Sequence, residues 1–147
     1  MEKYLVVTDD SDATKELGAY AAEIADPLDA ELIFGRFIDE DEYQNRLQRA
    51  ASTSRQIDSI RDAKSKAEEL AEEFAVEAVG DRDVSYRSVG IIDKMPEAIV
   101  EFAEEEGCEQ IFISGQRKSP TGKAIFGDRA QQVILNFDGF VTVNKPE

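Results

Sequence analysis

Short apolar runs alternate with stretches of helical periodicity along most of the chain, and this alternation constrains the fold more than any other feature. Each run is bounded by polar residues or glycine and has the length of a buried β-strand. The runs are Lys3–Thr8, Glu31–Ile38, Asp83–Val89, Gln110–Ser114 and Phe140–Val143. Parallel strands need a crossover connection, which is usually a helix. Five strands separated by helical segments therefore predict an α/β fold with a doubly wound parallel sheet.

The segments between the runs repeat apolar residues every three or four positions, as on the buried face of a helix. They lie before Asp26-Pro27, from Arg55 to Gly80, from Pro96 to Gly107 and from Arg129 to Phe137. The polar stretch from Asp39 to Ser54 has no clear period over its second half. We expect it to be a loop with at most one helical turn.

The length and charge of the chain limit its class and its partners. A chain of 147 residues suits one domain, and no apolar run approaches the roughly 20 residues that span a bilayer. The start, MEKYLVV, lacks the basic region and cleavage site of a secretory signal, so we expect a cytoplasmic protein. The formal charge of −15 would repel nucleic acid and anionic membranes, and neither is expected as a partner. Such acidity favours solubility and suits a salt-adapted microbe, because concentrated salt screens self-repulsion.

Cysteine and histidine are almost absent from the sequence, which excludes several kinds of chemistry. There is no histidine, so histidine-based catalysis and most zinc or iron sites are excluded. Cys108 is the single cysteine, so the chain forms no internal disulfide. We expect Cys108 to be a packed, unreactive thiol.

The stretch from Ile113 to Asp128, ISGQRKSPTGKAIFGD, gathers basic residues after the fourth strand of this acidic chain. Ligands of doubly wound sheets bind past the carboxyl ends of the strands, where the strand order reverses. A P-loop is excluded, because six residues rather than four separate Gly115 from Gly122, and Ala124 follows Lys123. Two interpretations of this stretch remain open. It either forms a concavity that binds an anion, or its glycines only permit turns while its basic side chains balance acidic neighbours.

Three aspartates and a serine follow the first strand, at the other strand end that matters for ligands. Carboxylates such as those of Asp9, Asp10 and Asp12 suit a hard cation, for example Mg²⁺. Asp and Ser side chains also cap helices, and we favour that role for Ser11 and Asp12. Asp9 lies directly at the strand end and is the candidate for contact with a ligand.

Four stretches together resemble the universal stress protein family along nearly the whole chain. They are VVTDDS, VGIIDKMPEAIVEFAEEEG, QIFISG and GQRKSPTGKAIFGD. The family has a first strand that ends in aspartate, and a later strand followed by G-x-x-G, a spacer and G-S at the start of the last helix. In this chain Lys118 stands at the second glycine of that pattern and Asp128 stands at the serine.

The resemblance implies a single domain over residues 1–147, a three-layer α/β/α sandwich that is Rossmann-like and similar to adenine nucleotide alpha hydrolases. It also implies a stress-response regulator that binds ATP or AMP, with Mg²⁺ or Mn²⁺ accompanying a triphosphate. A homodimer through Phe140–Val143 and an unknown protein partner are implied as well. The nucleotide-binding residues that it implies are Thr8, Asp9, Phe37, Gly115, Arg117, Lys118, Lys123, Gly127 and Asp128.

Asp128 leaves a second interpretation open, a dimeric interaction protein of the same fold that binds no nucleotide. A carboxylate repels phosphate, and two unit charges at about 4 Å interact by roughly 4 kcal/mol at an effective dielectric constant near 20. Lys118, Lys123 or Arg129 would offset this repulsion, and Asp128 would also complement the dipole of the last helix by about 0.3–1 kcal/mol. A third interpretation, an ATPase, extends at most to slow hydrolysis, because neither Asp9 nor Asp128 has a visible catalytic partner. We therefore expect no catalytic residue.

Overall fold

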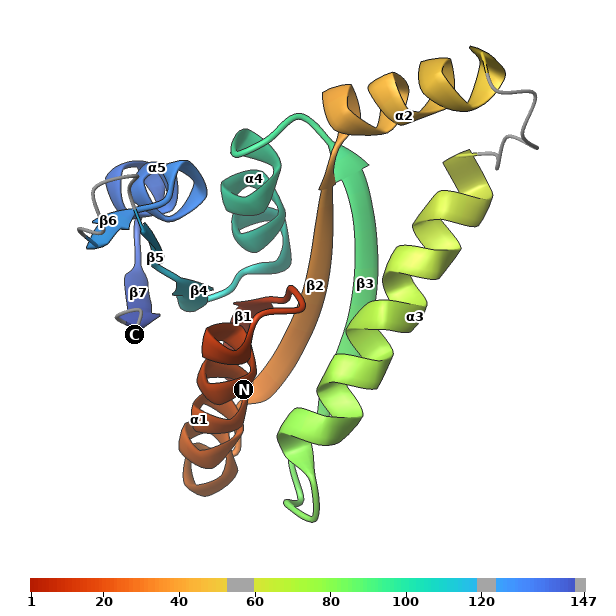
Figure 1. Cartoon of the computed structure of the whole chain (residues 1–147). Helices are drawn as coiled ribbons and strands as arrows, with labels where there is room; N and C mark the ends of the chain where they lie inside the picture. Colours follow the sequence, from red (N-terminus) through yellow and green to blue (C-terminus); the bar gives the residue numbers. More distant parts are fainter. Residues whose placement is uncertain (53–59, 119–123, 145–147) are drawn as a thin grey trace.

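Five parallel strands form the main sheet of the computed structural model, which describes residues 1–52, 60–118 and 124–144 (Figure 1). The strands are β1 (Lys3–Val7), β2 (Glu31–Asp39), β3 (Tyr86–Asp93), β4 (Gln110–Ser114) and β7 (Phe140–Asn144). Their order is β3-β2-β1-β4-β7, so β1 pairs with β2 on one side and with β4 on the other. The strand order therefore reverses at β1, which confirms the predicted doubly wound parallel sheet.

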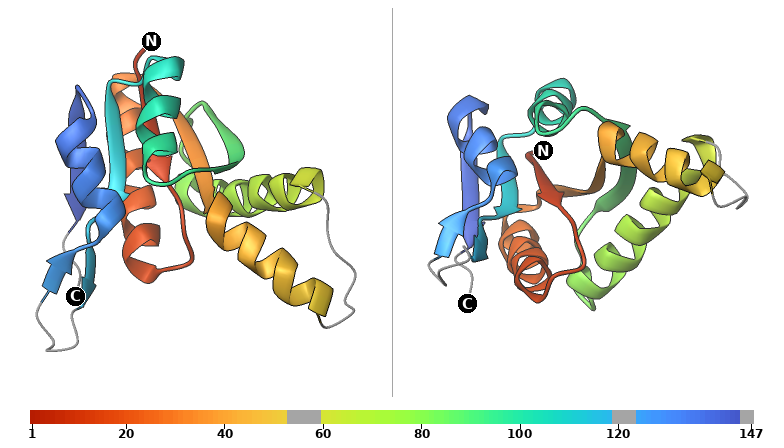
Figure 2. Two further views of the ribbon diagram at one scale, coloured as in Figure 1. Left: turned by 90° about the horizontal axis from the view of Figure 1, so that it is seen from above. Right: turned by 45° about the horizontal axis from the view of Figure 1, so that its top comes forward.

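Helices cover both faces of this sheet and make a three-layer α/β/α sandwich (Figures 1 and 2). One face carries α1 (Asp12–Leu28) and α3 (Ile60–Val79), and the other carries α4 (Glu97–Glu106) and α5 (Asp128–Asn136). In β1, Tyr4 and Val6 pack with α1 and α3, whereas Leu5 and Val7 pack with α4 and α5. Both sets are buried, which explains why the strands stand out in the sequence as continuous apolar runs.

Most of the predicted boundaries agree with the structure to within a few residues. β4 occupies the predicted residues, and α4 lies between Pro96 and Gly107, which takes the left-handed conformation (φ 73°). α1 continues past Pro27 to Leu28, and the left-handed Asp29 (φ 53°) then ends the helix. None of the helices among the described residues is long and apolar enough to cross a membrane.

The stretch from Asp39 to Ser54 was predicted to be a loop with at most one turn, and this prediction was wrong. It contains a helix, α2 (Glu40–Ser52). The first turn of α2 carries three acidic residues, which complement the positive end of the helix dipole. Tyr43 and Leu47 lie one turn apart, and Tyr43 is buried, so the helix has a short apolar face. The predicted start of the next helix, at Arg55, lies outside the described residues.

Strand β3 also differs from the prediction, which ran from Asp83 to Val89 and ended at Gly90. β3 instead begins at Tyr86 and continues through Gly90 to Asp93. A Cβ atom added at Gly90 would lie 2.6 Å from the backbone oxygen of Lys64 and 2.6 Å from the backbone nitrogen of Glu68. The glycine therefore permits close packing of α3 on the strand and does not end the strand.

Two short strands pair after β4, within the basic stretch from Ile113 to Asp128. They are β5 (Gln116–Lys118) and β6 (Ala124–Phe126), which form an antiparallel hairpin. The hairpin projects beyond the carboxyl end of β4 and leads into α5 (Figure 2).

Cys108 lies between α4 and β4 and packs into the core on that face of the sheet. Burial raises the pKa of its thiol to about 11, and the charge of Glu109 adds to this effect. The prediction of a packed thiol is confirmed.

Candidate functional site

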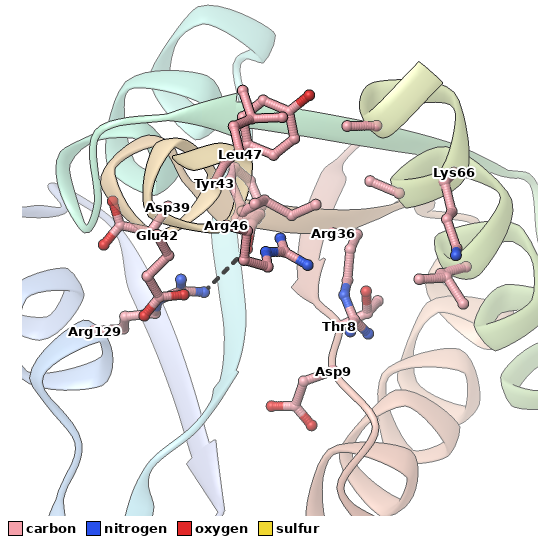
Figure 3. Close-up of a pocket in the computed structure, with 15 residues that line it drawn as sticks. Thr8, Asp9, Arg36, Asp39, Glu42, Tyr43, Arg46, Leu47, Lys66 and Arg129 are labelled. Atoms are coloured by element: carbon pink, nitrogen blue, oxygen red, sulfur yellow. Dashed lines mark hydrogen bonds between the residues drawn. The ribbon is translucent and has the colours of Figure 1, made fainter. Parts of the chain in front are cut away.

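A cavity of about 560 Å³ opens at the carboxyl ends of β1 and β2, between α2 and α3 (Figure 3). This is the edge of a doubly wound sheet at which ligands bind, and the volume is within the roughly 300–1,000 Å³ typical of small-molecule sites. Thr8, Asp9 and Phe37 are among the residues that line it. The structure thus brings together three of the residues that the sequence implicated in nucleotide binding.

Thr8 and Asp9 are held firmly at the end of β1. The backbone nitrogen of Thr8 donates to the carbonyl oxygen of Gly35 at 2.9 Å, and its Oγ1 donates to the same oxygen at 3.2 Å. Oδ1 of Asp9 accepts from the backbone nitrogen of Ser11 at 2.8 Å and from its hydroxyl at 2.6 Å. Among the described residues no donor reaches Oδ2 of Asp9, so this oxygen is available to a ligand.

Phe37 and Arg129 close the opposite side of the cavity. The ring of Phe37 packs edge-on against Phe102 of α4, with ring centroids 6.0 Å apart, so only part of the ring faces the cavity. Arg129, in the first turn of α5, donates from Nη1 to the carbonyl oxygen of Phe37 at 3.2 Å. This hydrogen bond joins the start of α5 to the end of β2 (Figure 3).

The stretch that contains Gly115, Gly122 and Gly127, called the glycine loop below, begins at the end of β4, on the other side of β1 from the cavity. The backbone nitrogen of Gly127 donates to the carbonyl oxygen of Gly115 at 2.9 Å, which closes the base of the hairpin. Neither glycine lines the cavity. Gly127 is the N-cap of α5 and makes no side-chain cap, and no atom of the described residues lies within 4 Å of the place where its Cβ atom would be. For Arg117 and Lys118 the structure describes the backbone in β5 only, and Lys123 lies outside the described residues.

Asp128 is exposed at the first position of α5. Arg129, which was one candidate to neutralise it, instead contacts Phe37, and none of the ion pairs among the described residues includes Asp128. Its position agrees with the interpretation that the carboxylate complements the dipole of the last helix. The side chains of Lys118 and Lys123, which would offset its charge, lie outside the described residues.

Three basic side chains that the sequence did not single out also line the cavity: Arg36, Arg46 and Lys66. Arg36 makes a bidentate ion pair with Asp10, with distances of 3.1 and 3.2 Å. The hydrogen bond and the charge of Arg36 lower the pKa of Asp10. Arg36 is a charged residue within the otherwise apolar run of β2, and this position could have identified it from the sequence. Arg46 and Lys66 come from α2 and α3, and no sequence period predicts that these helices meet across a cavity.

The three aspartates after β1 have separate roles in the structure. Asp9 orients Ser11, Asp10 pairs with Arg36, and Asp12 begins α1. Ser11 caps that helix, because its hydroxyl accepts from the backbone nitrogen of Thr14 at 3.2 Å. This confirms the capping interpretation for Ser11. No group of three or more potential metal ligands is found within the described part of the chain.

Comparison with solved structures shows the same fold in proteins of low sequence identity. The hypothetical protein MJ0577 has a TM-score of 0.76 at 20% identity, covering 99% of this chain and 96% of its own. A universal stress protein from Archaeoglobus fulgidus, solved in complex with dAMP, has a TM-score of 0.68 at 18% identity, covering 97% of each chain. A universal stress protein solved in complex with cAMP has a TM-score of 0.61 at 18% identity, covering 99% of this chain and 98% of its own.

A family comparison gives the assignment. No match was found among curated proteins. The profile of the universal stress protein family matches residues 1–145, which is nearly the whole chain. The stretches that resembled this family in the sequence all lie within that match. The chain therefore belongs to the universal stress protein family.

Proposed function

We propose that this protein binds an adenine nucleotide, ATP or AMP, at the carboxyl edge of its sheet and acts as a cytoplasmic regulator in a stress response. The observation that carries the proposal is the cavity at the ends of β1 and β2, in which Asp9 presents an available carboxylate oxygen beside Phe37. Two members of the family with this fold were solved with dAMP and with cAMP, which supports an adenine nucleotide as the ligand.

The residues of the cavity suit the nucleoside part of such a ligand. Its apolar wall, which includes Phe37, Tyr43 and Leu70, would pack against a purine ring. Oδ2 of Asp9 would accept a hydrogen bond from a ribose hydroxyl or from the amino group of adenine. Charge-assisted hydrogen bonds of this kind are stronger than neutral ones, which makes Asp9 the residue on which affinity depends most.

The glycine loop is the proposed phosphate side of the site. Gly127 begins α5, where backbone N–H groups and the helix dipole favour an anion. No described residue lies where a Cβ atom of Gly127 would be, so none of them prevents a phosphate from approaching the backbone there. Arg117, Lys118 and Lys123 would add positive charge near Gly115 and Asp128, and Mg²⁺ or Mn²⁺ would accompany a triphosphate.

Binding of ATP by a variant of Asp9 tests this proposal. Asp9→Asn keeps the oxygen that accepts from Ser11 but loses the available carboxylate oxygen. We expect it to weaken ATP binding about tenfold in a calorimetric titration at high salt, because one charge-assisted hydrogen bond is lost. Glu105→Gln, an equal charge change at an exposed site on α4, serves as the control and should bind like the wild type. Wild-type protein that releases no nucleotide on extraction and shows no heat of binding with millimolar ATP would contradict the proposal.

The same proposal includes a homodimer joined through β7. This strand is one of the two edge strands of the sheet, and no strand of the described residues pairs with its outer edge, which a second copy could therefore join. Phe140 on β7 is 75% exposed and Leu135 on α5 is 68% exposed, and exposed apolar side chains near a free edge favour association.

Sedimentation velocity in high salt tests the dimer. Phe140→Glu places a charge in the proposed interface and should convert a dimer into a monomer. Leu28→Glu, at an exposed apolar position at the end of α1, is the matched control and should leave the dimer intact. A wild-type protein that sediments as a monomer at micromolar concentration would show that β7 does not mediate association.

A second candidate function is an interaction protein of this fold that binds no nucleotide. The exposed carboxylate of Asp128, at the helix start where phosphate would lie, favours it. If this candidate is right, wild-type protein will bind no ATP, and Asp128→Ser will create binding. Tight binding by the wild type would exclude it.

A further inference from the structure

The ratio of basic to acidic side chains is higher in the cavity lining than in the chain as a whole. The chain has 32 acidic and 17 basic residues, whereas the described residues that line the cavity include four basic and three acidic ones. A net positive lining is unexpected where acidic residues outnumber basic ones almost two to one. It indicates that the cavity is built to favour an anion.

These charges are separated within the cavity (Figure 3). Asp39, the last residue of β2, and Glu42, in the first turn of α2, lie on the same side as Arg129. Arg36 and Lys66 lie on the opposite side, and the guanidinium of Arg46 turns toward them from α2. The α3 side of the cavity is therefore lined by cations, whereas the α5 side contains both signs.

The acidic side chains of the lining already have roles of their own. Oδ1 of Asp39 accepts from the backbone nitrogen of Asp41 at 3.0 Å, and Glu42 lies in the first turn of α2, where it complements the helix dipole. Asp9 is bonded to Ser11. None of these contacts neutralises a basic side chain on the α3 side.

Two of the three cations on the α3 side have no neutralising partner in the described part of the chain. The side chain of Arg36 is 21% exposed and is fixed by Asp10 from outside the cavity. For Arg46 and Lys66, no hydrogen bond or ion pair with a described residue is found. Like charges that face the same partly enclosed space repel each other, and an anion bound between them would remove that repulsion.

We propose that Arg36, Arg46 and Lys66 form an anion subsite on the α3 side of the cavity, which binds phosphate groups of the nucleotide. Guanidinium and ammonium groups are the side chains that bind phosphate most strongly, and the fixed position of Arg36 preorganises the subsite. This subsite lies across β1 from the glycine loop. The subsite is thus an alternative to the glycine loop as the phosphate side of the site: a nucleotide whose base packs against the apolar wall would direct its phosphates toward α3 and away from Asp128.

The inference rests on the proposed function for the nucleoside part of the ligand, but the subsite itself requires only phosphate. Phosphate groups are present both in a nucleotide and in free polyphosphate. Titrations with ATP, adenosine and inorganic tripolyphosphate distinguish these two sources.

The test compares two double variants by calorimetry. Arg46→Gln with Lys66→Gln removes two charges from the subsite and leaves the Arg36–Asp10 pair intact. Arg61→Gln with Lys64→Gln removes two charges from exposed positions of α3 that do not line the cavity. All four side chains are exposed, so both variants should fold, which circular dichroism and the unfolding midpoint will verify.

We expect the cavity variant to bind ATP at least about tenfold more weakly than the control variant, because it loses charge-assisted contacts. Both variants should bind adenosine equally, and tripolyphosphate should compete with ATP on the control variant only. Equal ATP affinities in the two variants would overturn the subsite and leave the proposed nucleotide binding standing. If wild type binds neither ATP nor adenosine, the proposed function fails. In that case, tripolyphosphate binding that is lost only in the cavity variant would still support the subsite, and no tripolyphosphate binding would overturn it.

Discussion

Replacing Gly90 by alanine should destabilise the protein by about 1–3 kcal/mol, the usual cost of forcing extra volume into a close-packed site. The added methyl group would lie 2.6 Å from two backbone atoms of α3 and 2.8 Å from the Cβ atom of Ala67. Backbone atoms cannot rotate away, so α3 must move as a unit. Gly90 lies within β3, an edge strand whose backbone pairs with β2, so a shift of Gly90 away from α3 would disturb its pairing with Arg36.

Thermal unfolding measures this cost. Unfolding entropy is about 2.1 cal/mol/K per residue, or roughly 0.3 kcal/mol/K for a chain of 147 residues. The Gly90→Ala variant should therefore unfold about 3–10 °C below wild type. ATP affinity should fall as well, because α3 supplies Lys66 and the apolar side chains of the cavity wall.

Gly127→Ala is the matched control for this prediction. Gly127 has φ −68°, and no described residue lies where the methyl group would be, so alanine is compatible with the backbone. Alanine reduces the freedom of the unfolded chain but is a poorer N-cap than glycine, and each effect is about 1 kcal/mol or less, so the unfolding midpoint should stay within about 3 °C of the wild type. If Gly90→Ala unfolds at the wild-type temperature, α3 does not pack against β3 as described, and the cavity wall is misplaced.

Three further predictions concern single side chains. Cys108 should react with a thiol reagent at neutral pH at least about tenfold more slowly in folded protein than in urea, because burial raises its pKa to about 11; equal rates would refute its burial. Ser11→Ala should lower stability by about 1 kcal/mol, measured by urea unfolding, because it removes the cap of α1, and an unchanged midpoint would argue against that cap. Arg36 lowers the pKa of Asp10, so this pair stabilises the folded protein at pH values above the ordinary pKa of aspartate. The stabilisation is lost as the pH falls through the lowered pKa of Asp10. Asp10 is 83% exposed, so Asp10→Asn should cost less than about 1 kcal/mol near neutral pH and nothing in strong acid, and a cost that persists in acid would contradict the pairing.

The sheet was predictable because its strands are buried on both faces. Residues 4–7 of β1 and residues 111–113 of β4 are apolar without interruption, and the helices between strands have long apolar faces. Helix α2 was not predictable in this way, because its apolar face consists chiefly of Tyr43 and Leu47. Its stability depends on packing over the cavity and on the acidic first turn, and neither feature produces a repeated pattern.

Gly90 shows a related limit of sequence interpretation. A glycine after an apolar run can end a strand, or it can admit a neighbouring helix to the strand backbone, and the two cases have the same local sequence. Only the position of α3 distinguishes them.

The candidate site was predictable where it lies at a strand end and unpredictable where it comes from helices. Asp9 follows from its place at a strand end and from the family resemblance, Phe37 follows from the resemblance alone, and both line the cavity. Arg46 and Lys66 lie on α2 and α3, which meet across the cavity only in three dimensions. Their contribution to the charge of the cavity could not be inferred from the order of residues in the chain.

The central claim is that an adenine nucleotide binds at the carboxyl ends of β1 and β2, and amide chemical-shift mapping by NMR tests it most directly. On titration with ATP in high salt, we predict saturable shifts of the amides of Asp9, Phe37 and Lys66, with α4 amides such as that of Glu101 unchanged. Spectra that do not change at millimolar ATP, or shifts confined to residues far from the cavity, would contradict the account.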